Sequence, residues 1–316
     1  MPKKSRIKPI FNPFSPSSSH GKKEQKKTAL FCLIIVAMIW FLTPISTLIA
    51  QFILMNIDVQ DDIILGVESY REIRNTYPIV QDTWGVRDIG KQLVARTTLS
   101  NAFCASTALD VKKCTDQVRQ YQWSFEVVSS PEVNAFALPG GIIRVTNSLL
   151  NQLQLTRGEI AALLGHEIGH VLHRHSQARL LKGQLVQTIL KALVYEDGDD
   201  YEESFGEAVT EILISSAKFL GNMRFSRQDE YEADNTAFDI LVNSDMYDPR
   251  AVQTLLEKLW TLSDGNSDKN SKQSVLEFMN GWDKTHPGTE DRIKEMQKRW
   301  SSLAKSEKRK FYGLQR

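Results

Sequence analysis

The chain has little cysteine, no excess of charge of either sign and no internal repeat. Its 316 residues hold three cysteines, and 39 Lys and Arg are balanced by 38 Asp and Glu, which gives a formal net charge of +1. This balance provides no bulk attraction to nucleic acid, so we expect no nucleic-acid partner. The length is sufficient for one or two domains with a sizeable hydrophobic core.

The segment from Thr28 to Ile57 contains no charged residue. Residues 28–52 are rich in large apolar side chains, and about twenty such residues span a bilayer, so we predict one transmembrane helix here. Residues 1–27 hold eight Lys or Arg, one acid and several prolines, which predicts a disordered basic tail on the cytoplasmic side. A cleaved signal peptide is the alternative, but no small residues occupy both cleavage positions near Ala50.

This topology places the remainder of the chain across the membrane. We therefore expect a single-pass protein of the bacterial inner membrane with a periplasmic catalytic domain, in preference to the mitochondrial intermembrane space. Cys104 and Cys114 are ten residues apart and lie beyond the predicted span. In an oxidising compartment they can form a disulfide; two free thiols are the alternative.

The most informative motif is His166-Glu-Ile-Gly-His170. Two His four residues apart lie on one helix face, about 6 Å apart along the axis, so both imidazoles can bind one zinc ion. Glu167 between them is placed to act as general base toward water. The surrounding sequence is helical in period, with Thr156 as N-cap and Glu159 three residues later, and we expect the helix to reach Leu181. The alternative is a helix with two hydrogen-bonded core histidines.

A catalytic zinc ion needs a third protein ligand and a position for water. On a straight helix His173 lies about 10 Å from His166 and His175 faces away, so both are expected at the surface or behind the ligands. The acidic segment 226–237 offers Glu230 and Asp234 on one face, with Glu232 roughly opposite. A carboxylate of this segment would complete the site, and Asp234 could fix the tautomer of a ligand histidine. An acidic solvent face remains the alternative.

The overall pattern predicts an α+β, mainly helical fold with a small β-sheet beside the zinc helix. Alternation predicts strands at 123–128, 134–138 and 142–146, the last two at hairpin distance. An exposed edge of this sheet could hold an extended peptide. The remaining segments are predicted to be helices at 58–120, 183–194, 205–221, 227–242 and 251–262, solvated loops at 196–203 and 264–274, and a basic solvated tail at 305–316. Residues 58–304 would form the catalytic domain.

Four segments together resemble the membrane-associated gluzincin peptidases, a family that includes HtpX, the CAAX prenyl endopeptidases, the mitochondrial Oma-type proteases and BepA. They are Asn134-Ala-Phe-Ala-Leu-Pro-Gly-Gly141, His166-Glu-Ile-Gly-His170, Glu230-Tyr-Glu-Ala-Asp234 and Thr285-His-Pro287 with Arg292-Ile293. The resemblance covers roughly residues 85–300. It implies Glu230 as third zinc ligand, Asp234 behind the ligands, and His286 near the site, where it stabilises an oxyanion or occupies the water position at rest.

This resemblance implies a zinc-dependent endopeptidase with one zinc per chain, acting on misfolded or unassembled proteins at the cell envelope. Its substrate-aligning edge would be formed by Asn134, Ala135, Phe136, Ala137, Gly140 and Gly141. The single predicted span and the lack of helical repeats after residue 300 favour the single-anchored branch and not prenyl-peptide processing. The alternatives are a membrane-anchored, chaperone-like or binding protein with a latent or structural zinc site, and a non-peptidase zinc hydrolase.

Overall fold

The computed structural model describes residues 58–99, 111–181, 224–263, 282–286 and 289–314. Its elements, in chain order, are α2 (Val59–Ile73), α3 (Val86–Leu99), α5 (Val111–Gln120), β1 (Ser124–Val128), β2 (Ala135–Leu138), η1 (Pro139–Gly141), β3 (Ile142–Thr146), α6 (Asn147–Leu153), α7 (Arg157–Leu172), α10 (Arg227–Ser244), α11 (Ala251–Ser263), α13 (Trp282–Thr285), α14 (Thr289–Ser302) and α15 (Lys305–Phe311). The prediction of a mainly helical fold with one small sheet is confirmed.

The three strands form one sheet in the order β1-β3-β2. β2 and β3 pair antiparallel, as their hairpin spacing predicts, and β1 pairs parallel with β3. β2 is therefore an edge strand, but all four of its residues are buried, so the exposed edge expected from the sequence is not observed. Both α7 and α2 contact β2, and the Ser176 hydroxyl donates to the Ala137 carbonyl oxygen at 3.4 Å.

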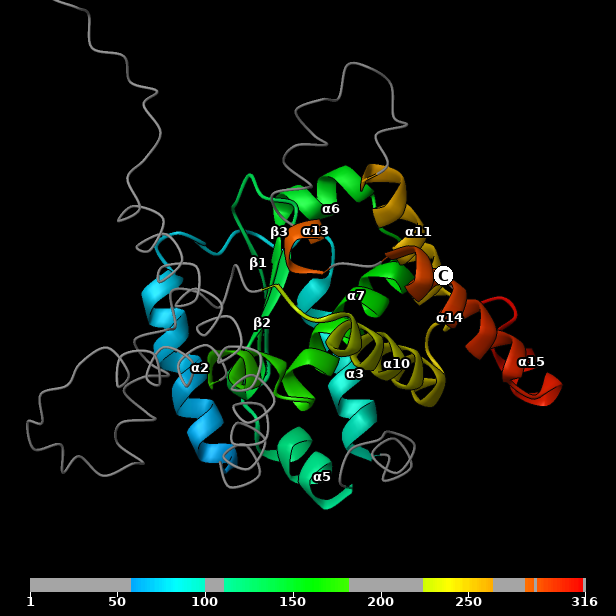
Figure 1. Cartoon of the computed structure of the whole chain (residues 1–316), viewed down its shortest axis with the longest axis horizontal. Helices are drawn as coiled ribbons and strands as arrows, with labels where there is room; N and C mark the ends of the chain where they lie inside the picture. The colour runs from blue at the N-terminus through cyan, green and yellow to red at the C-terminus, as the bar shows by residue number, and fades with distance from the viewer. Residues whose placement is uncertain (1–57, 100–110, 182–223, 264–281, 287–288, 315–316) are drawn as a thin grey trace, which may run out of the picture. The chain divides into compact units, whose positions relative to one another are not determined.

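The helix α7 lies at the centre of the fold and packs closely along α10 (Figure 1). Its first turn has the predicted capping box: the Thr156 side chain accepts from the Glu159 N–H, and the Glu159 carboxylate accepts from the Thr156 N–H. Gly165 and Gly169 face α10, and a Cβ at Gly169 would lie 2.9 Å from the Ala233 Cα. The absence of side chains at these glycines lets the two helices approach closely enough to share one site.

The predicted end of the zinc helix at Leu181 is wrong. Helix α7 ends at Leu172, His173 is its C-cap, and Arg174 adopts a left-handed conformation with φ 56° before a new helical segment covers 175–181. Such a conformation is unfavourable for a residue with a Cβ and needs support from tertiary contacts. The Arg174 guanidinium supplies them through a buried ion pair with Asp62 of α2, at 2.6 Å between Nη2 and Oδ2.

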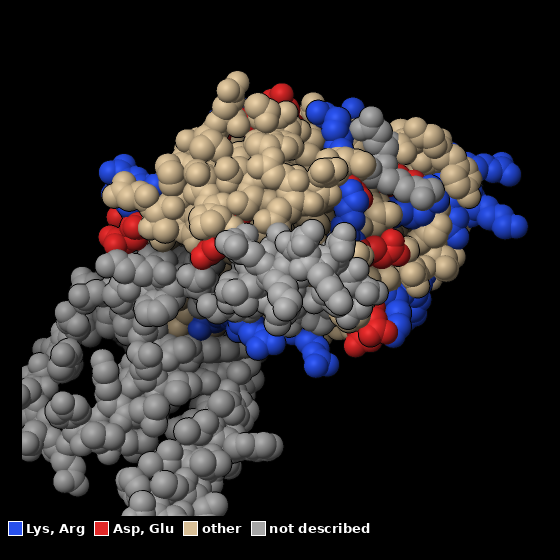
Figure 2. Space-filling view, turned by 90° about the horizontal axis from the view of Figure 1, so that it is seen from above, with Lys and Arg blue, Asp and Glu red and all other residues tan. Residues whose placement is uncertain are grey.

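The C-terminal segment also differs from the expectation of a solvated tail. Residues 305–311 form helix α15, and Phe311 is buried against Trp300. Three of the basic residues of α15, Lys305, Arg309 and Lys310, remain exposed, and Figure 2 shows Lys and Arg on the side where Figure 1 places this helix. The buried Phe311 ring and the contacts of Lys308 with Trp300 and Ser301 tie the segment to α14, although its charge pattern alone is typical of a solvated chain end.

Several predicted segments lie outside the described residues: the basic tail 1–27, the transmembrane segment 28–52, the helices at 183–194 and 205–221, and the loops at 196–203 and 264–274. Within the described part of the chain, no helix combines the length and apolar character needed to cross a membrane. Cys114 is buried and disulfide-bonded, whereas Cys104 lies outside the described residues, so the pairing of these two cysteines stays a prediction.

Candidate metal centre

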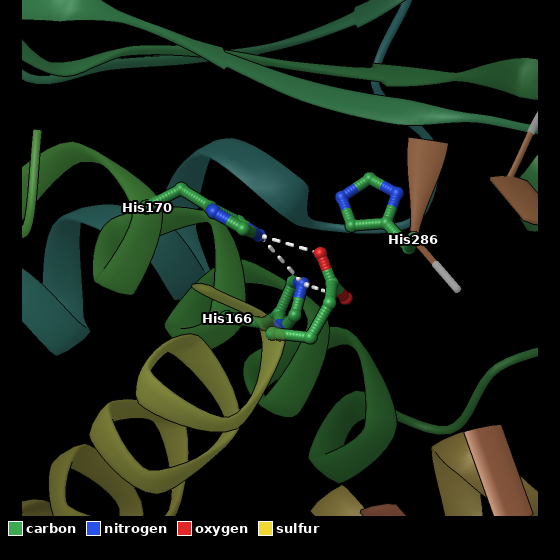
Figure 3. Close-up of side chains that lie close together, drawn as sticks. His166, His170 and His286 are labelled. Atoms are coloured by element: carbon green, nitrogen blue, oxygen red, sulfur yellow. Dashed lines mark hydrogen bonds and ion pairs between the residues drawn. The ribbon is translucent and has the colours of Figure 1, made fainter. Parts of the chain in front are cut away.

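The cluster of possible metal ligands combines side chains from three separate segments. His166 and His170 come from α7, Glu230 from the first turn of α10, and His286 directly follows α13. One ligand atom from each of the four residues lies within 4.8 Å of the other three, and all four residues are buried. Figure 3 shows the rings of His166, His170 and His286 turned toward one common region.

The distances within this cluster suit a shared cation. The Nε2 atoms of His166 and His170 are 3.0 Å apart. In the Glu230 carboxylate, the Oε2 atom lies 3.6 Å from the His166 Nε2, and the Oε1 atom lies 3.5 Å from the His170 Nε2. Three ligand atoms on one tetrahedral ion are separated by about 3 to 4 Å, so the observed spacing matches that of a zinc site.

Electrostatics favour a cation at the same place. Burial lowers the pKa of His166 and of His170, so both imidazoles are neutral and can offer a lone pair to a metal. Burial raises the pKa of Glu230 well above its usual value, although Arg292 opposes the rise. Neither carboxylate oxygen of Glu167 has a hydrogen-bond partner among the described residues, and neither has the Glu230 Oε1, whereas the Glu230 Oε2 forms an ion pair with the Arg292 Nη1 at 2.6 Å. Buried carboxylate oxygens without donors are costly, and a divalent cation would compensate for them, so these residues fit zinc.

Glu167 is the second buried acid of the site. Burial raises its pKa to about 8, with Arg292 acting in the opposite direction. Its Oε1 lies 3.8 Å from the His286 Nε2. Because the apolar surroundings disfavour its charge, a carboxylate here is poised to take up a proton, as a general base must.

The ligand residues are held by a buried network that ends at Arg292 of α14. The Asp234 Oδ1 lies 2.9 Å from the His166 Nδ1, and the Arg292 Nε donates to the Asp234 Oδ2 at 2.6 Å. The Arg292 Nη1 also lies 2.6 Å from the Glu230 Oε2. Burial alone would raise the pKa of Asp234, but the ion pair and hydrogen bonds with Arg292 outweigh it and lower this pKa to about 2. Asp234 is therefore a charged acceptor that fixes the His166 tautomer.

His286 is oriented by its neighbours in sequence. Its Nδ1 lies 2.7 Å from the Thr285 Oγ1, and its ring stacks on Trp282 at 4.0 Å between centroids. Its Nε2 has no hydrogen-bond partner among the described residues. This arrangement directs one ring nitrogen toward Glu167 and the metal ligands and leaves it able to bind a substrate atom.

The residues expected to align a substrate divide into three groups. The Asn134 side chain reaches the His286 segment, since the Thr285 hydroxyl lies 3.4 Å from the Asn134 Oδ1. Gly140 and Gly141 have positive φ angles and pack instead on α2 and on Trp123. Gly140 and Gly141 therefore allow a tight turn that other residues would adopt only with strain. Substrate contacts by Ala135, Phe136 and Ala137 stay a prediction.

Two residues make contacts in the site that the sequence pattern does not predict. Arg292 stands in one of the quoted motifs, but nothing in the local pattern reveals that it pairs with both Glu230 and Asp234. His175 is expected to face away from His166 and His170, yet its Nδ1 lies 2.8 Å from the His170 Nδ1. The left-handed Arg174 causes this difference, because it ends α7 and turns the chain back.

Comparisons with known proteins agree with this geometry. The profile of Peptidase family M48 matches residues 94–300. The chain is 37% identical over 150 residues to the mitochondrial metalloendopeptidase OMA1 of Arabidopsis thaliana, covering 47% of this chain and 28% of the relative. It is 30% identical over 142 residues to the metalloprotease LoiP of Escherichia coli, covering 45% and 53%. It is 26% identical over 252 residues to the E. coli beta-barrel assembly-enhancing protease, covering 76% and 44%. The chain thus spans about a quarter to a half of these relatives.

Proposed function

Because the chain belongs to Peptidase family M48, we propose that it is a zinc-dependent endopeptidase with His166, His170 and Glu230 as metal ligands. The observation that carries the proposal is the convergence of these three side chains in a buried cluster, with the carboxylate 3.5 and 3.6 Å from the two imidazoles. Three protein ligands and one remaining position are typical of catalytic zinc. When bound, zinc would polarise the scissile carbonyl and lower the pKa of the attacking water.

The chain's own residues would perform the proton transfers. Glu167, whose two oxygens have no donor among the described residues, would accept the proton of the attacking water and pass it to the leaving amine. The His286 Nε2, 3.8 Å from Glu167, would stabilise the negative charge that develops on the scissile carbonyl oxygen. Asp234 and Arg292 would hold the ligands in place without touching the substrate.

We propose misfolded or unassembled proteins of the cell envelope as the substrate class. The name of one relative supports this class, since it is the beta-barrel assembly-enhancing protease of E. coli. The substrate backbone would lie along β2, which is the edge strand nearest to α7. Since the β2 residues are buried, part of the protein has to move before a peptide can pair with this edge.

Removal of the metal should abolish peptide hydrolysis. With unfolded casein as substrate, excess 1,10-phenanthroline should reduce the rate on the order of 100-fold or more, because the metal contributes several kcal/mol to the transition state. Stoichiometric zinc added after chelator removal should restore the rate. Digestion that persists in chelator would contradict the proposal, and binding of casein without digestion in either condition would favour a chaperone-like protein.

We also propose a single-pass location in a bacterial inner membrane, with residues 58–304 in the periplasm. The charge-free segment 28–52 behind the basic residues 1–27 supports this topology. In E. coli cells that produce the full chain, protease added to spheroplasts should digest the catalytic domain, whereas inverted membrane vesicles should protect it. The opposite protection pattern would show that the domain is cytoplasmic.

A further inference from the structure

The two histidines on α7 differ in what supports them. The His166 Nδ1 is paired directly with a carboxylate, that of Asp234 at 2.9 Å. The His170 Nδ1 instead lies 2.8 Å from the His175 Nδ1, and the His175 Nε2 lies 3.1 Å from the Glu232 Oε2. We propose that His175 and Glu232 are positioning residues for the metal ligand His170, which they hold through a hydrogen-bonded chain. This inference rests on the proposed metal site.

The positions of the hydrogens follow from the chemistry of the rings. The His170 Nε2 faces His166 and Glu230, so it is the nitrogen that would offer its lone pair to a metal. A neutral imidazole that binds metal through Nε2 carries its hydrogen on Nδ1. The His170 Nδ1–H must then donate to the His175 Nδ1, and the hydrogen of His175 must reside on Nε2. That N–H donates to Glu232, so each of the three groups has a compatible partner.

The backbone explains why His175 can reach His170. Five residues along a regular helix correspond to a rotation of about 140° beyond a full turn, which would turn the two side chains apart. Because α7 ends at Leu172 and Arg174 is left-handed, His175 returns to His170 with 4.9 Å between ring centroids. The buried ion pair of Arg174 with Asp62 holds this turn in place.

Glu232 is itself oriented for this contact. It lies on α10 two residues after Glu230, and its Oε1 accepts from the Gln228 Nε2 at 2.8 Å while Oε2 faces His175. The residue is only partly buried, so its charge is partly solvated. Glu232 would thus orient His170 as Asp234 orients His166, except that the His175 ring lies between Glu232 and the ligand.

A second metal ion is the rival interpretation, because ligand atoms of His173, His175 and Glu232 also lie within 4.8 Å of one another. The contacts favour the hydrogen-bonded chain. The His175 Nε2 is within hydrogen-bonding distance of Glu232, whereas the His173 Nδ1 is 3.6 Å from the same oxygen. The His173 Nε2 pairs with the Thr236 Oγ1 at 2.9 Å, which gives this ring a partner of its own.

Zinc affinity of the full-length, detergent-solubilised protein tests the proposal, measured by competition with a chromophoric chelator. Loss of an outer hydrogen-bond partner reduces metal affinity about 10- to 100-fold, so we expect that loss for His175→Ala. His175→Asn, which keeps an acceptor near the Nδ1 position, should recover part of it, and Glu232→Gln should lose less than His175→Ala. The matched control is His173→Ala, which removes a ring that stacks on His175 but none of the hydrogen bonds from His170 to Glu232, and which should bind zinc like the wild type.

Several results would overturn the proposal. One is wild-type affinity in both His175→Asn and Glu232→Gln, two variants that preserve polar character if His175→Ala fails to fold. Another is a stoichiometry of two zinc ions per wild-type chain that falls to one in His173→Ala. That result would establish the second metal ion instead. Failure of the proposed function is distinguishable, since His166→Ala would then leave zinc stoichiometry and affinity unchanged.

Discussion

Glu167→Gln is expected to abolish peptide hydrolysis while zinc stays bound. The substitution keeps the shape of the side chain but removes the group that takes the proton from water, and loss of a general base costs about 10²- to 10⁴-fold in rate. The carboxylate makes no hydrogen bond with the described residues, so its loss should leave the ligand geometry intact. Casein digestion and metal content by atomic absorption measure the two quantities in the same preparation.

A matched control for this variant lies on the same helix. Glu159→Gln makes the same chemical change in the first turn of α7, where Glu159 caps Thr156 and pairs with Lys258 at the far end from the ligands. It should retain activity. Full activity in Glu167→Gln would exclude Glu167 as the base. A mass-spectrometric comparison of an envelope proteome digested by the wild type and by Glu167→Gln would also test the proposed substrate class.

Arg292→Met should produce the largest loss of stability. Its guanidinium is the shared cation of Glu230 and Asp234, and all three side chains are at most 1% exposed. Removing one partner from a buried ion pair costs about 3–5 kcal/mol, because the remaining charge has no compensation. We therefore expect a lower free energy of unfolding in urea with chelator present, together with weakened zinc binding, since Glu230 and His166 lose their support.

Arg299→Met provides the comparison. Arg299 also extends from α14 to an aspartate of α10, Asp239 at 2.6 Å, but its side chain is 27% exposed. Solvent screening weakens ion pairs as exposure rises, so this variant should lose less stability than Arg292→Met, even though Arg299 also donates to Asn235. Equal free energies of unfolding for the two variants would show that the buried network around Asp234 does not stabilise the fold more than a partly solvated pair does.

Local sequence patterns predicted those parts of the site that are encoded within one segment. The spacing of His166 and His170, the capping box at Thr156 and the antiparallel pairing of β2 with β3 are all local, and the last two appear in the structure as expected. The parallel pairing of β1 with β3 is not local, because β2 intervenes in the chain. Periodicity alone does not decide whether Glu230 faces the zinc helix or solvent. Glu230 is identified as a ligand only by the resemblance of several motifs to a known family.

The parts that could not be predicted depend on contacts between distant segments. Arg292 reaches Asp234 across 58 residues of sequence, and no periodicity reports such a pairing. The sequence pattern turns His175 away from His170 because it extends α7 as a regular helix beyond Leu172. The turn at Arg174 is stabilised by Asp62, 112 residues earlier, so nothing near Arg174 in the sequence indicates that the helix ends there.

The pairing of Arg174 with Asp62 also shows that residues ahead of the family profile stabilise the fold. The family profile begins at residue 94, yet Asp62 and the Asp58 carbonyl both bind the Arg174 guanidinium from upstream of that point. A shortened chain that started at residue 94 would leave a buried guanidinium without its counter-ion and would uncover η1, on which α2 packs. We therefore expect a chain that starts at Asp58, 36 residues ahead of the match to the family profile, to be more stable than one that starts at residue 94.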